Sequence, residues 1–199
     1  MTKALIVIDV QNDFRPGGAL AVNEGDQVVG PINEMMNDYP LRILTQDWHP
    51  AGHSSFASVH SGKAAFEVTQ MPYGPQVLWP DHCIQGSEGA AFHPALNTDR
   101  AAMIVRKGYN PEIDSYSAFF ENDHKTPTGL EGFLRTKGIT SLMLAGLATD
   151  FCVAYSALDA ARLGFDVTVD LAACRAIDLD SSLDRALEQM RAAGVTLKG

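Results

Sequence analysis

The segment Ala4-Leu-Ile-Val-Ile-Asp9-Val10 decides the fold class. It is a short run of apolar, largely β-branched residues without two-residue alternation, which is typical of a strand buried on both faces of a parallel sheet. Such a strand needs helices packed on both of its faces. Further strands are expected at 41–45, 102–106, 142–146, 167–171 and 195–197.

Helical patterns separate these strands, and they lie at 28–36, 128–138, 151–162 and 181–193. Pro31 falls in the first turns of the first helix, where proline is tolerated. Thr128-Gly-Leu-Glu131 has the spacing of a capping box, and Gly138 is a natural helix end. Strands alternating with helices predict right-handed crossovers and a three-layer α/β/α fold with a six-stranded, mainly parallel sheet.

From Trp48 to about Asn97 the periodicity disappears, although the segment holds much of the chain's Pro, Gly and His. A long irregular segment inside a compact domain is usually functional or disordered. Its two tryptophans and several phenylalanines argue against disorder, so we expect a functional segment. With no repeat and no linker, residues 1–199 are expected to form a single domain.

Composition excludes several classes of protein. The formal net charge is -9, and no run of Lys or Arg offers a basic patch for nucleic acid or an anionic membrane. No apolar stretch is long enough to cross a bilayer, and no signal-like segment begins the chain, so a cytoplasmic location is expected. The three cysteines, Cys83, Cys152 and Cys174, are too few and too widely spaced for a disulfide framework.

Three chemically active side chains fall at or just beyond expected strand ends, namely Asp9, Lys107 and Cys152. The carboxyl ends of parallel strands are where sites gather in such folds. Taken singly, each has an ordinary alternative: a buried aspartate bonded to a loop, a solvated lysine, and a core cysteine. Taken together, they predict an acyl-transfer site.

The chemistry of these three groups is coherent. A cysteine in the first turn of a helix lies at the positive end of the helix dipole, which favours a lowered thiol pKa, and a nearby lysine would lower the pKa further. A thiolate attacks an amide carbonyl, and a carboxylate carries the thiol proton to the leaving amine. The N–H groups around Ala148 and Cys152 are candidates to hold the developing oxyanion.

The irregular segment carries a candidate metal site. Asp47 and His49 are two residues apart at the end of a strand, and His82 follows Trp79. An aspartate and two histidines suit one divalent ion, zinc first, with iron or manganese as alternatives. His53 is either a further ligand or a group that orients one. The remaining histidines, His60, His93 and His124, are interpreted as polar loop residues.

Aromatic residues cluster beside these groups in the sequence. Most are core residues by default. Phe14, Trp79 and Tyr116 lie in expected loops next to candidate catalytic residues, so they are candidates to form a flat slot for a planar ring.

Five short motifs occur in a fixed order along the chain. They are Asp9-Val-Gln-Asn-Asp-Phe14, Asp47-Trp-His49-Pro with His53-Ser-Ser-Phe56, Trp79-Pro-Asp-His82-Cys83, Lys107 with Asp114-Ser-Tyr-Ser-Ala-Phe119, and Gly146-Leu-Ala-Thr-Asp-Phe-Cys152-Val. In these motifs, and over nearly its whole length, the chain resembles the nicotinamidases of the isochorismatase-like hydrolase family. The resemblance implies a six-stranded parallel sheet and a frequent tendency to form homo-oligomers.

The resemblance also implies residue roles in hydrolysing nicotinamide, and also pyrazinamide, to an acid and ammonia. Cys152 would be the nucleophile, Asp9 the proton acceptor and donor, and Lys107 their electrostatic partner. A cis peptide is implied between Leu147 and Ala148.

In the same family a metal binds the pyridine nitrogen of nicotinamide. The resemblance assigns that metal to Asp47, His49 and His82, and it implies that Phe14 and Trp79 flank the ring.

Three rival hypotheses remain. The first is another cysteine amidohydrolase of the family, acting on a carbamoyl or ureido compound without needing a metal. The second is isochorismatase itself, which cleaves a vinyl ether and does not use this cysteine. The third is a catalytically silent binding or scaffold domain, against which the intact Asp9, Lys107 and Cys152 argue.

Overall fold

One parallel sheet organises the computed structural model, which describes residues 2–199. Within that range six strands pair in the order β5-β2-β1-β6-β7-β8, and every pairing between them is parallel. All six expected strands are confirmed, although β7 is longer than its apolar pattern. The strands are β1 (Lys3–Ile8), β2 (Leu41–Asp47), β5 (Met103–Lys107), β6 (Ser141–Leu147), β7 (Asp166–Arg175) and β8 (Thr196–Lys198).

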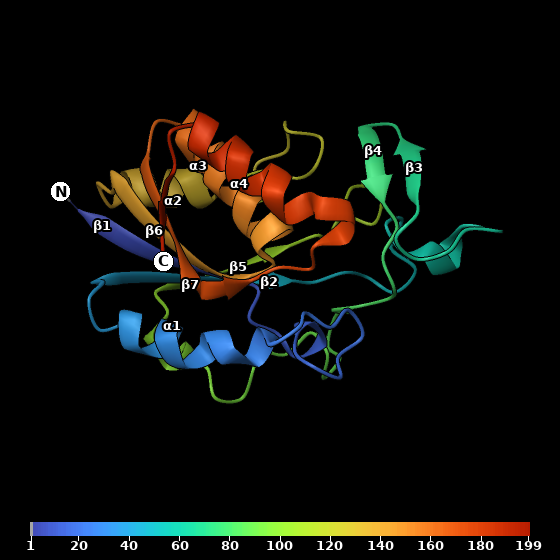
Figure 1. Cartoon of the computed structure of the whole chain (residues 1–199), viewed down its shortest axis with the longest axis horizontal. Helices are drawn as coiled ribbons and strands as arrows, with labels where there is room; N and C mark the ends of the chain where they lie inside the picture. Colours follow the sequence, from blue (N-terminus) through green and yellow to red (C-terminus); the bar gives the residue numbers. More distant parts are fainter. Residues whose placement is uncertain (1) are drawn as a thin grey trace.

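Helices cover both faces of this sheet (Figure 1), so the expected three-layer fold is confirmed. Helix α1 (Val29–Met35) lies on one face, with Pro31 in its first turn. The opposite face carries α2 (Leu130–Thr136), α3 (Ala154–Arg162) and α4 (Ser182–Ala192). Within residues 2–199, no helix combines the length and the apolar character needed to cross a bilayer.

The prediction of a capping box at the start of α2 is wrong. The helix begins after Gly129, whose φ is 92°, so the residue at the N-cap position has no side chain to bond the helix. The Thr128 hydroxyl instead accepts a bond from the Leu130 N–H (3.3 Å) and donates to the Ala118 carbonyl (2.6 Å). The hydroxyl therefore links the first N–H of α2 to the loop that precedes the helix. The expected helix end is confirmed, since Gly138 follows α2 with a φ of 66°.

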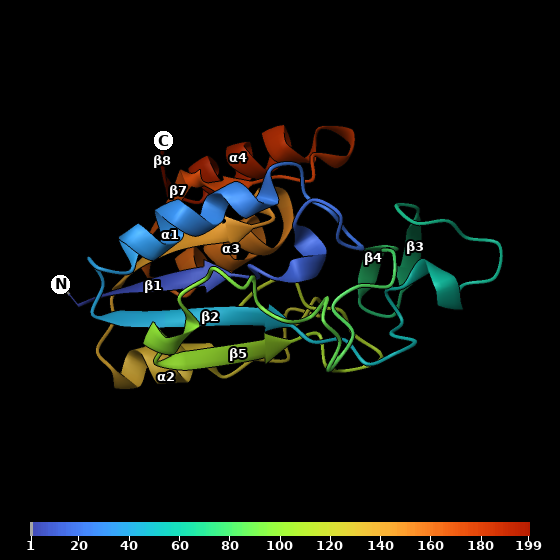
Figure 2. The same ribbon diagram turned by 90° about the horizontal axis from the view of Figure 1, so that it is seen from below.

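The segment between β2 and β5 is less irregular than its sequence indicates. It contains an antiparallel hairpin of β3 (Val68–Met71) and β4 (Gly74–Val77). Both strands are short and β4 contains Gly74 and Pro75, so no alternating pattern marks them. Figure 2 shows the hairpin and its loops beyond the carboxyl ends of β1, β2 and β5.

The strand order places a topological switch point between β1 and β6. From β1 the chain moves outward through β2 to β5, and then returns to β6 and moves outward in the other direction. In open α/β sheets, ligands bind outside the carboxyl ends of the strands at such a point. Asp9 follows β1 there, and Cys152 follows β6.

Gly146 permits β6 to approach β1 at this switch point. Its φ is 130°, and a Cβ atom added there would collide with the backbone of Ile8. The register between β6 and β7 also shifts between Leu144 and Gly146. A residue with a side chain could therefore not occupy this position without moving the backbone of the central strand.

We expect Gly146→Ala to lower the free energy of unfolding by about 3 kcal/mol, because it combines a disfavoured φ with a backbone clash. The matched control is Gly132→Ala, since Gly132 lies exposed in α2 and an added Cβ meets nothing within 4 Å there. The control should raise the free energy of unfolding by roughly 0.5–1 kcal/mol. Urea denaturation measures both values, and equal effects of the two substitutions would contradict the close approach.

Candidate active site

A buried lysine joins the parts of this site. Lys107 ends β5, and the whole residue is 1% exposed. Its ammonium lies 2.8 Å from Asp9 Oδ2, forms an ion pair with Asp47 Oδ1, and lies 3.4 Å from Cys152 Sγ. It also donates a hydrogen bond to the Ser115 carbonyl (2.9 Å). The structure therefore brings together the three predicted catalytic side chains, which come from the ends of three different strands.

Lys107 and the carboxylates around it shift one another's pKa values. Burial by itself would lower the pKa of Lys107, but the carboxylates of Asp47 and Asp9 outweigh it and hold that pKa well above its ordinary value. Burial would likewise raise the pKa of Asp47, yet Lys107 and the neighbouring His49 and His82 keep it well below its usual range. Lys107 is therefore a permanent cation beside an ionised Asp47.

Asp9 differs from Asp47 in its protonation tendency. Burial raises the pKa of the Asp9 carboxyl, Lys107 opposes the rise, and the nearby Asp47 charge adds to it. Thr45 Oγ1 donates a hydrogen bond to Asp9 Oδ1 (2.6 Å) and accepts one from the Asp9 N–H (3.2 Å). A carboxyl whose pKa is raised in this way is suited to carry a proton during a reaction.

Cys152 lies in a π-helical turn, Thr149–Val153, that precedes α3. Its side chain is 7% exposed and its sulfur is one of three ligand-type atoms, with oxygens of Asp9 and Asp47, that all lie within 4.8 Å of one another. Burial raises the pKa of the Cys152 thiol well above its ordinary value, although Lys107 opposes the rise. The lowered thiol pKa expected from the sequence is therefore wrong, because desolvation and two carboxylates outweigh the lysine. The resting sulfur is a thiol that needs a base.

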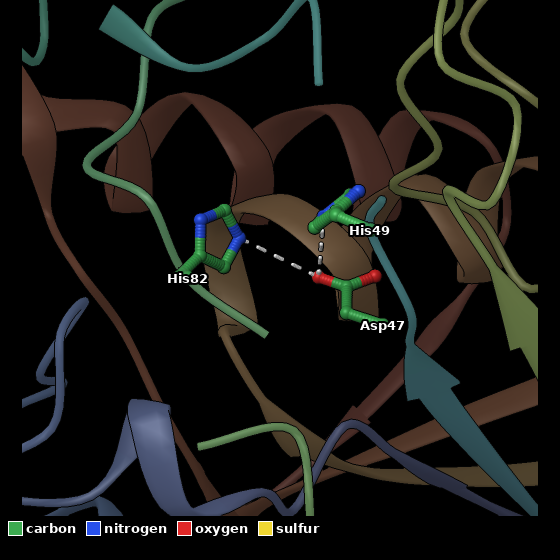
Figure 3. A group of neighbouring side chains, drawn as sticks. All are labelled: Asp47, His49 and His82. Atoms are coloured by element: carbon green, nitrogen blue, oxygen red, sulfur yellow. Dashed lines mark ion pairs between the residues drawn. The ribbon is translucent and has the colours of Figure 1, made fainter. Parts of the chain in front are cut away.

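Asp47, His49 and His82 converge beside the catalytic group (Figure 3). The Nε2 atoms of the two histidines lie 3.7 and 3.8 Å from Asp47 Oδ2. One ligand atom from each residue lies within 4.8 Å of the others, and all three residues are buried. Two residues come from the end of β2 and the loop after it, and His82 comes from the loop after β4.

The hydrogen bonds of the two histidines fit this trio to a divalent metal. His49 Nδ1 lies 2.9 Å from the Gly108 carbonyl, and His82 Nδ1 lies 2.8 Å from the Pro80 carbonyl. A carbonyl only accepts, so each Nδ1 carries a proton and each Nε2 is the ring atom that faces Asp47. With both Nε2 atoms deprotonated, as metal ligation requires, two imidazoles and a carboxylate form a donor set for a divalent ion.

His53 takes a supporting position next to this trio. Its Nε2 lies 2.8 Å from the Asn110 carbonyl, and its Nδ1 accepts the Ser55 N–H at 3.1 Å. Both ring nitrogens are therefore engaged, and the ring packs against His49 with centroids 4.6 Å apart. Of the two alternatives from the sequence, this geometry favours a residue that orients a ligand.

A small pocket opens next to Cys152 and the metal trio. The expected slot residues all line it, and apolar atoms make up most of its wall. The expected cis peptide between Leu147 and Ala148 is present at its edge. The predicted residues in the wall are Phe14, Trp79, Tyr116 and Ala148, together with Asp47, His82 and Cys152.

Several residues of the site escaped the sequence reasoning. Leu20, Asp114, Phe151 and Ile177 also line the pocket. Asp114 begins a motif quoted above, so its place in that motif was the available signal. Ile177 is held by a hydrogen bond, because its backbone N–H donates to the Asp150 carboxylate at 3.0 Å. No local sequence pattern predicts this contact, because its two residues are 27 positions apart in the chain.

The comparisons with known proteins agree with this geometry. The model of the isochorismatase domain matches residues 3–198. A nicotinamidase of Acinetobacter baylyi is 52% identical over 192 residues, which make up 96% of this chain and 90% of that protein.

Two solved structures resemble the chain closely. That of a nicotinamidase/pyrazinamidase from Acinetobacter baumanii has a TM-score of 0.98 and 51% identity, and covers 99% of this chain and 95% of that one. That of a pyrazinamidase from Pyrococcus horikoshii in complex with zinc has a TM-score of 0.80 and 35% identity, and covers 99% and 98%. Since the family model spans almost every residue and the motifs meet in one pocket, the chain belongs to the isochorismatase family.

Proposed function

We propose that the chain is a metal-dependent amidohydrolase that converts nicotinamide to nicotinic acid and ammonia. The observation that carries this proposal is the approach of Lys107 Nζ to both Cys152 Sγ (3.4 Å) and Asp9 Oδ2 (2.8 Å) at a pocket whose wall includes two members of the metal-ligand trio, Asp47 and His82. The names of the two Acinetobacter relatives support the substrate. In this proposal residues 1–199 act as a single domain.

The first half of the reaction forms a thioester. The Asp9 carboxylate takes the thiol proton of Cys152, and the sulfur attacks the carboxamide carbon. The Ala148 and Cys152 N–H groups are proposed to hold the oxyanion, since both residues line the pocket. The C–N bond then breaks as Asp9 returns the proton to the nitrogen, and ammonia leaves.

The second half releases the acid. Water attacks the thioester carbon, and Asp9 removes a proton from that water. The C–S bond breaks, nicotinic acid leaves, and the proton on Asp9 restores the Cys152 thiol. Lys107 stays charged throughout, so it stabilises the thiolate and the ionised Asp9 in turn.

Asp47, His49 and His82 would hold the metal, for which we propose zinc. The bound ion would supply a Lewis-acid position for the ring nitrogen of the substrate. The zinc complex of the Pyrococcus horikoshii pyrazinamidase supports this choice. Phe14 and Trp79 both line the pocket, and their rings suit contact with an aromatic substrate. Pyrazinamide is a second proposed substrate because it presents the same carboxamide on a similar ring.

The main rival is an amidohydrolase for a carbamoyl or ureido compound. Such a substrate has no ring nitrogen to occupy a metal position, and it does not need a planar slot. The buried aromatic wall and the two oriented imidazoles favour nicotinamide over that class.

We expect Cys152→Ala to reduce kcat for ammonia release by at least about 10³-fold, because it removes the nucleophile. The matched control is Cys174→Ala, which removes another buried free cysteine away from this pocket. The control should keep most of the activity. Steady-state ammonia assays with far-UV circular dichroism test both variants, and undiminished turnover by folded Cys152→Ala would refute the mechanism.

Removal of the metal should abolish ammonia release, and added Zn²⁺ should restore it, because the trio would lose the ion that orients the ring. Dialysis against a chelator followed by elemental analysis and an activity assay makes the measurement. If turnover stayed the same after verified metal loss, the carbamoyl-directed rival would be favoured.

Gly108→Ala should weaken metal binding by about tenfold or more, because supporting contacts of ligating histidines typically carry effects of this size. Gly108 has a φ of 67°, and an added Cβ would press on the His49 ring whose Nδ1 bonds the Gly108 carbonyl. Competition with a chromogenic chelator measures the affinity directly.

The matched control for this substitution is Gly132→Ala in α2, where an added Cβ meets nothing within 4 Å. It should leave metal affinity unchanged. Equal metal affinity in both variants and the wild-type chain would show that Gly108 does not position His49.

A further inference from the structure

We propose that Gln76, on the β3–β4 hairpin, is a positioning residue that sets the aromatic wall of the substrate pocket. This inference rests on the proposed function and deepens it. The hairpin lies outside the main sheet and shows almost only exposed or half-buried residues. Within its two strands Gln76 alone is buried, with an exposed fraction of 1%. A buried amide needs hydrogen-bonding partners, and two of its partners line the pocket.

The donor side of the Gln76 amide faces two residues that line the pocket. Its Nε2 lies 2.7 Å from Asp114 Oδ2, 2.7 Å from Tyr116 Oη and 2.8 Å from the Val77 carbonyl of its own strand, so its two hydrogens are shared among three acceptors. Asp114 and Tyr116 are 38 and 40 residues further along the chain. Both of them are buried, and both contribute to the pocket wall. One side chain of the hairpin therefore contacts two pocket residues of the motif at 114–119.

The acceptor side determines which way the amide points. Its Oε1 accepts hydrogen bonds from Tyr73 Oη (3.2 Å) and from Asn122 Nδ2 (3.1 Å). The opposite side faces a carboxylate, which has no hydrogen to donate when it is ionised. A flipped amide would set its oxygen against that carboxylate and its nitrogen against the Asn122 amide nitrogen. The network therefore admits a single orientation of Gln76.

The contact continues from Tyr116 to the ring slot. Trp79 Nε1 donates to Tyr116 Oη at 3.0 Å, so the phenol oxygen accepts from Gln76 and from Trp79. Trp79 packs edge-on against Phe151, with ring centroids 4.9 Å apart. The indole plane is thus held by packing on one side and by the Tyr116 bond at its nitrogen. Loss of Gln76 would release the phenol that orients the indole.

The expected effect is on substrate binding more than on chemistry. In the proposed function, Trp79 and Tyr116 contact the substrate ring, which is present in both the ground state and the transition state. Displacing these two side chains should therefore weaken binding of both states by the same amount. None of the contacts among Cys152, Asp9 and Lys107 involves Gln76. A change in the wall should therefore raise KM while leaving kcat nearly unchanged.

The test is Gln76→Met, which keeps the length of the side chain and removes all of its hydrogen bonds. We expect KM for nicotinamide to rise about tenfold and kcat to change less than about threefold, as expected when uniform binding is lost. The matched control is Gln70→Met on β3, where Gln70 is exposed and bonds only its neighbour Met71 (3.3 Å). The control should change neither constant.

A double-mutant cycle separates positioning from general damage. Tyr116→Phe removes the phenol oxygen through which Gln76 reaches Trp79. If Gln76 acts through that oxygen, the effects of Gln76→Met and Tyr116→Phe on KM should be clearly less than additive. Fully additive effects would overturn the proposed route through Tyr116.

A second variant keeps the inference testable if Gln76→Met fails to fold. Gln76→Glu keeps the oxygen that Tyr73 and Asn122 bond, but it sets a second carboxylate against Asp114, so KM should again rise. A folded variant with unchanged KM overturns the inference, while the wild-type chain still releases ammonia. Absence of ammonia release from the metal-loaded wild-type chain would instead overturn the proposed function, and the inference with it.

Discussion

One buried ammonium group connects the two halves of the site. Lys107 contacts the carboxylates of Asp9 and Asp47, and each of these serves a different part of the pocket. Asp9 lies with Cys152, for which we propose acyl transfer, and Asp47 lies with the two histidines that we propose as metal ligands. Without the lysine two carboxylates would remain buried with no protein cation beside them, which proteins tolerate poorly. The remaining features of the site depend on this ion-pair cluster.

The same cluster explains why the pKa values of Asp9 and Asp47 are shifted in opposite directions. Asp47 has the lysine and two imidazoles around it, so its pKa stays well below the usual range. Asp9 has a similar ion pair but full burial and the Asp47 charge against it, so its pKa is raised. Two carboxylates with pKa values driven apart are a recurring arrangement for dividing electrostatic and proton-transfer roles. The high thiol pKa of Cys152 matches an Asp9 that accepts its proton.

Short-range patterns identified the residues that carry chemistry. Asp9, Asp47 and Lys107 could be predicted because each directly follows or ends an apolar strand, and parallel strands bring such positions to one rim. Cys152 could be predicted because it lies between a strand and a helix. Thr45, Asp114 and Gln76 could not be assigned roles in this way, since their partners are 36 to 40 residues distant and no local pattern encodes them. The pKa of Cys152 was predicted in the wrong direction because burial cannot be read from a helix position.

By itself, the sequence determined the layered parallel sheet, because the alternation of buried strands and amphipathic helices admits few arrangements. It also determined which residue types are available for catalysis and for metal binding. Only the tertiary structure decided that both ring nitrogens of His53 are engaged, that a hairpin forms beyond the strand ends, and that Gln76 bonds Asp114 and Tyr116. These outcomes depend on hydrogen bonds between segments far apart in the chain, whose strength is set by burial and by exact distance.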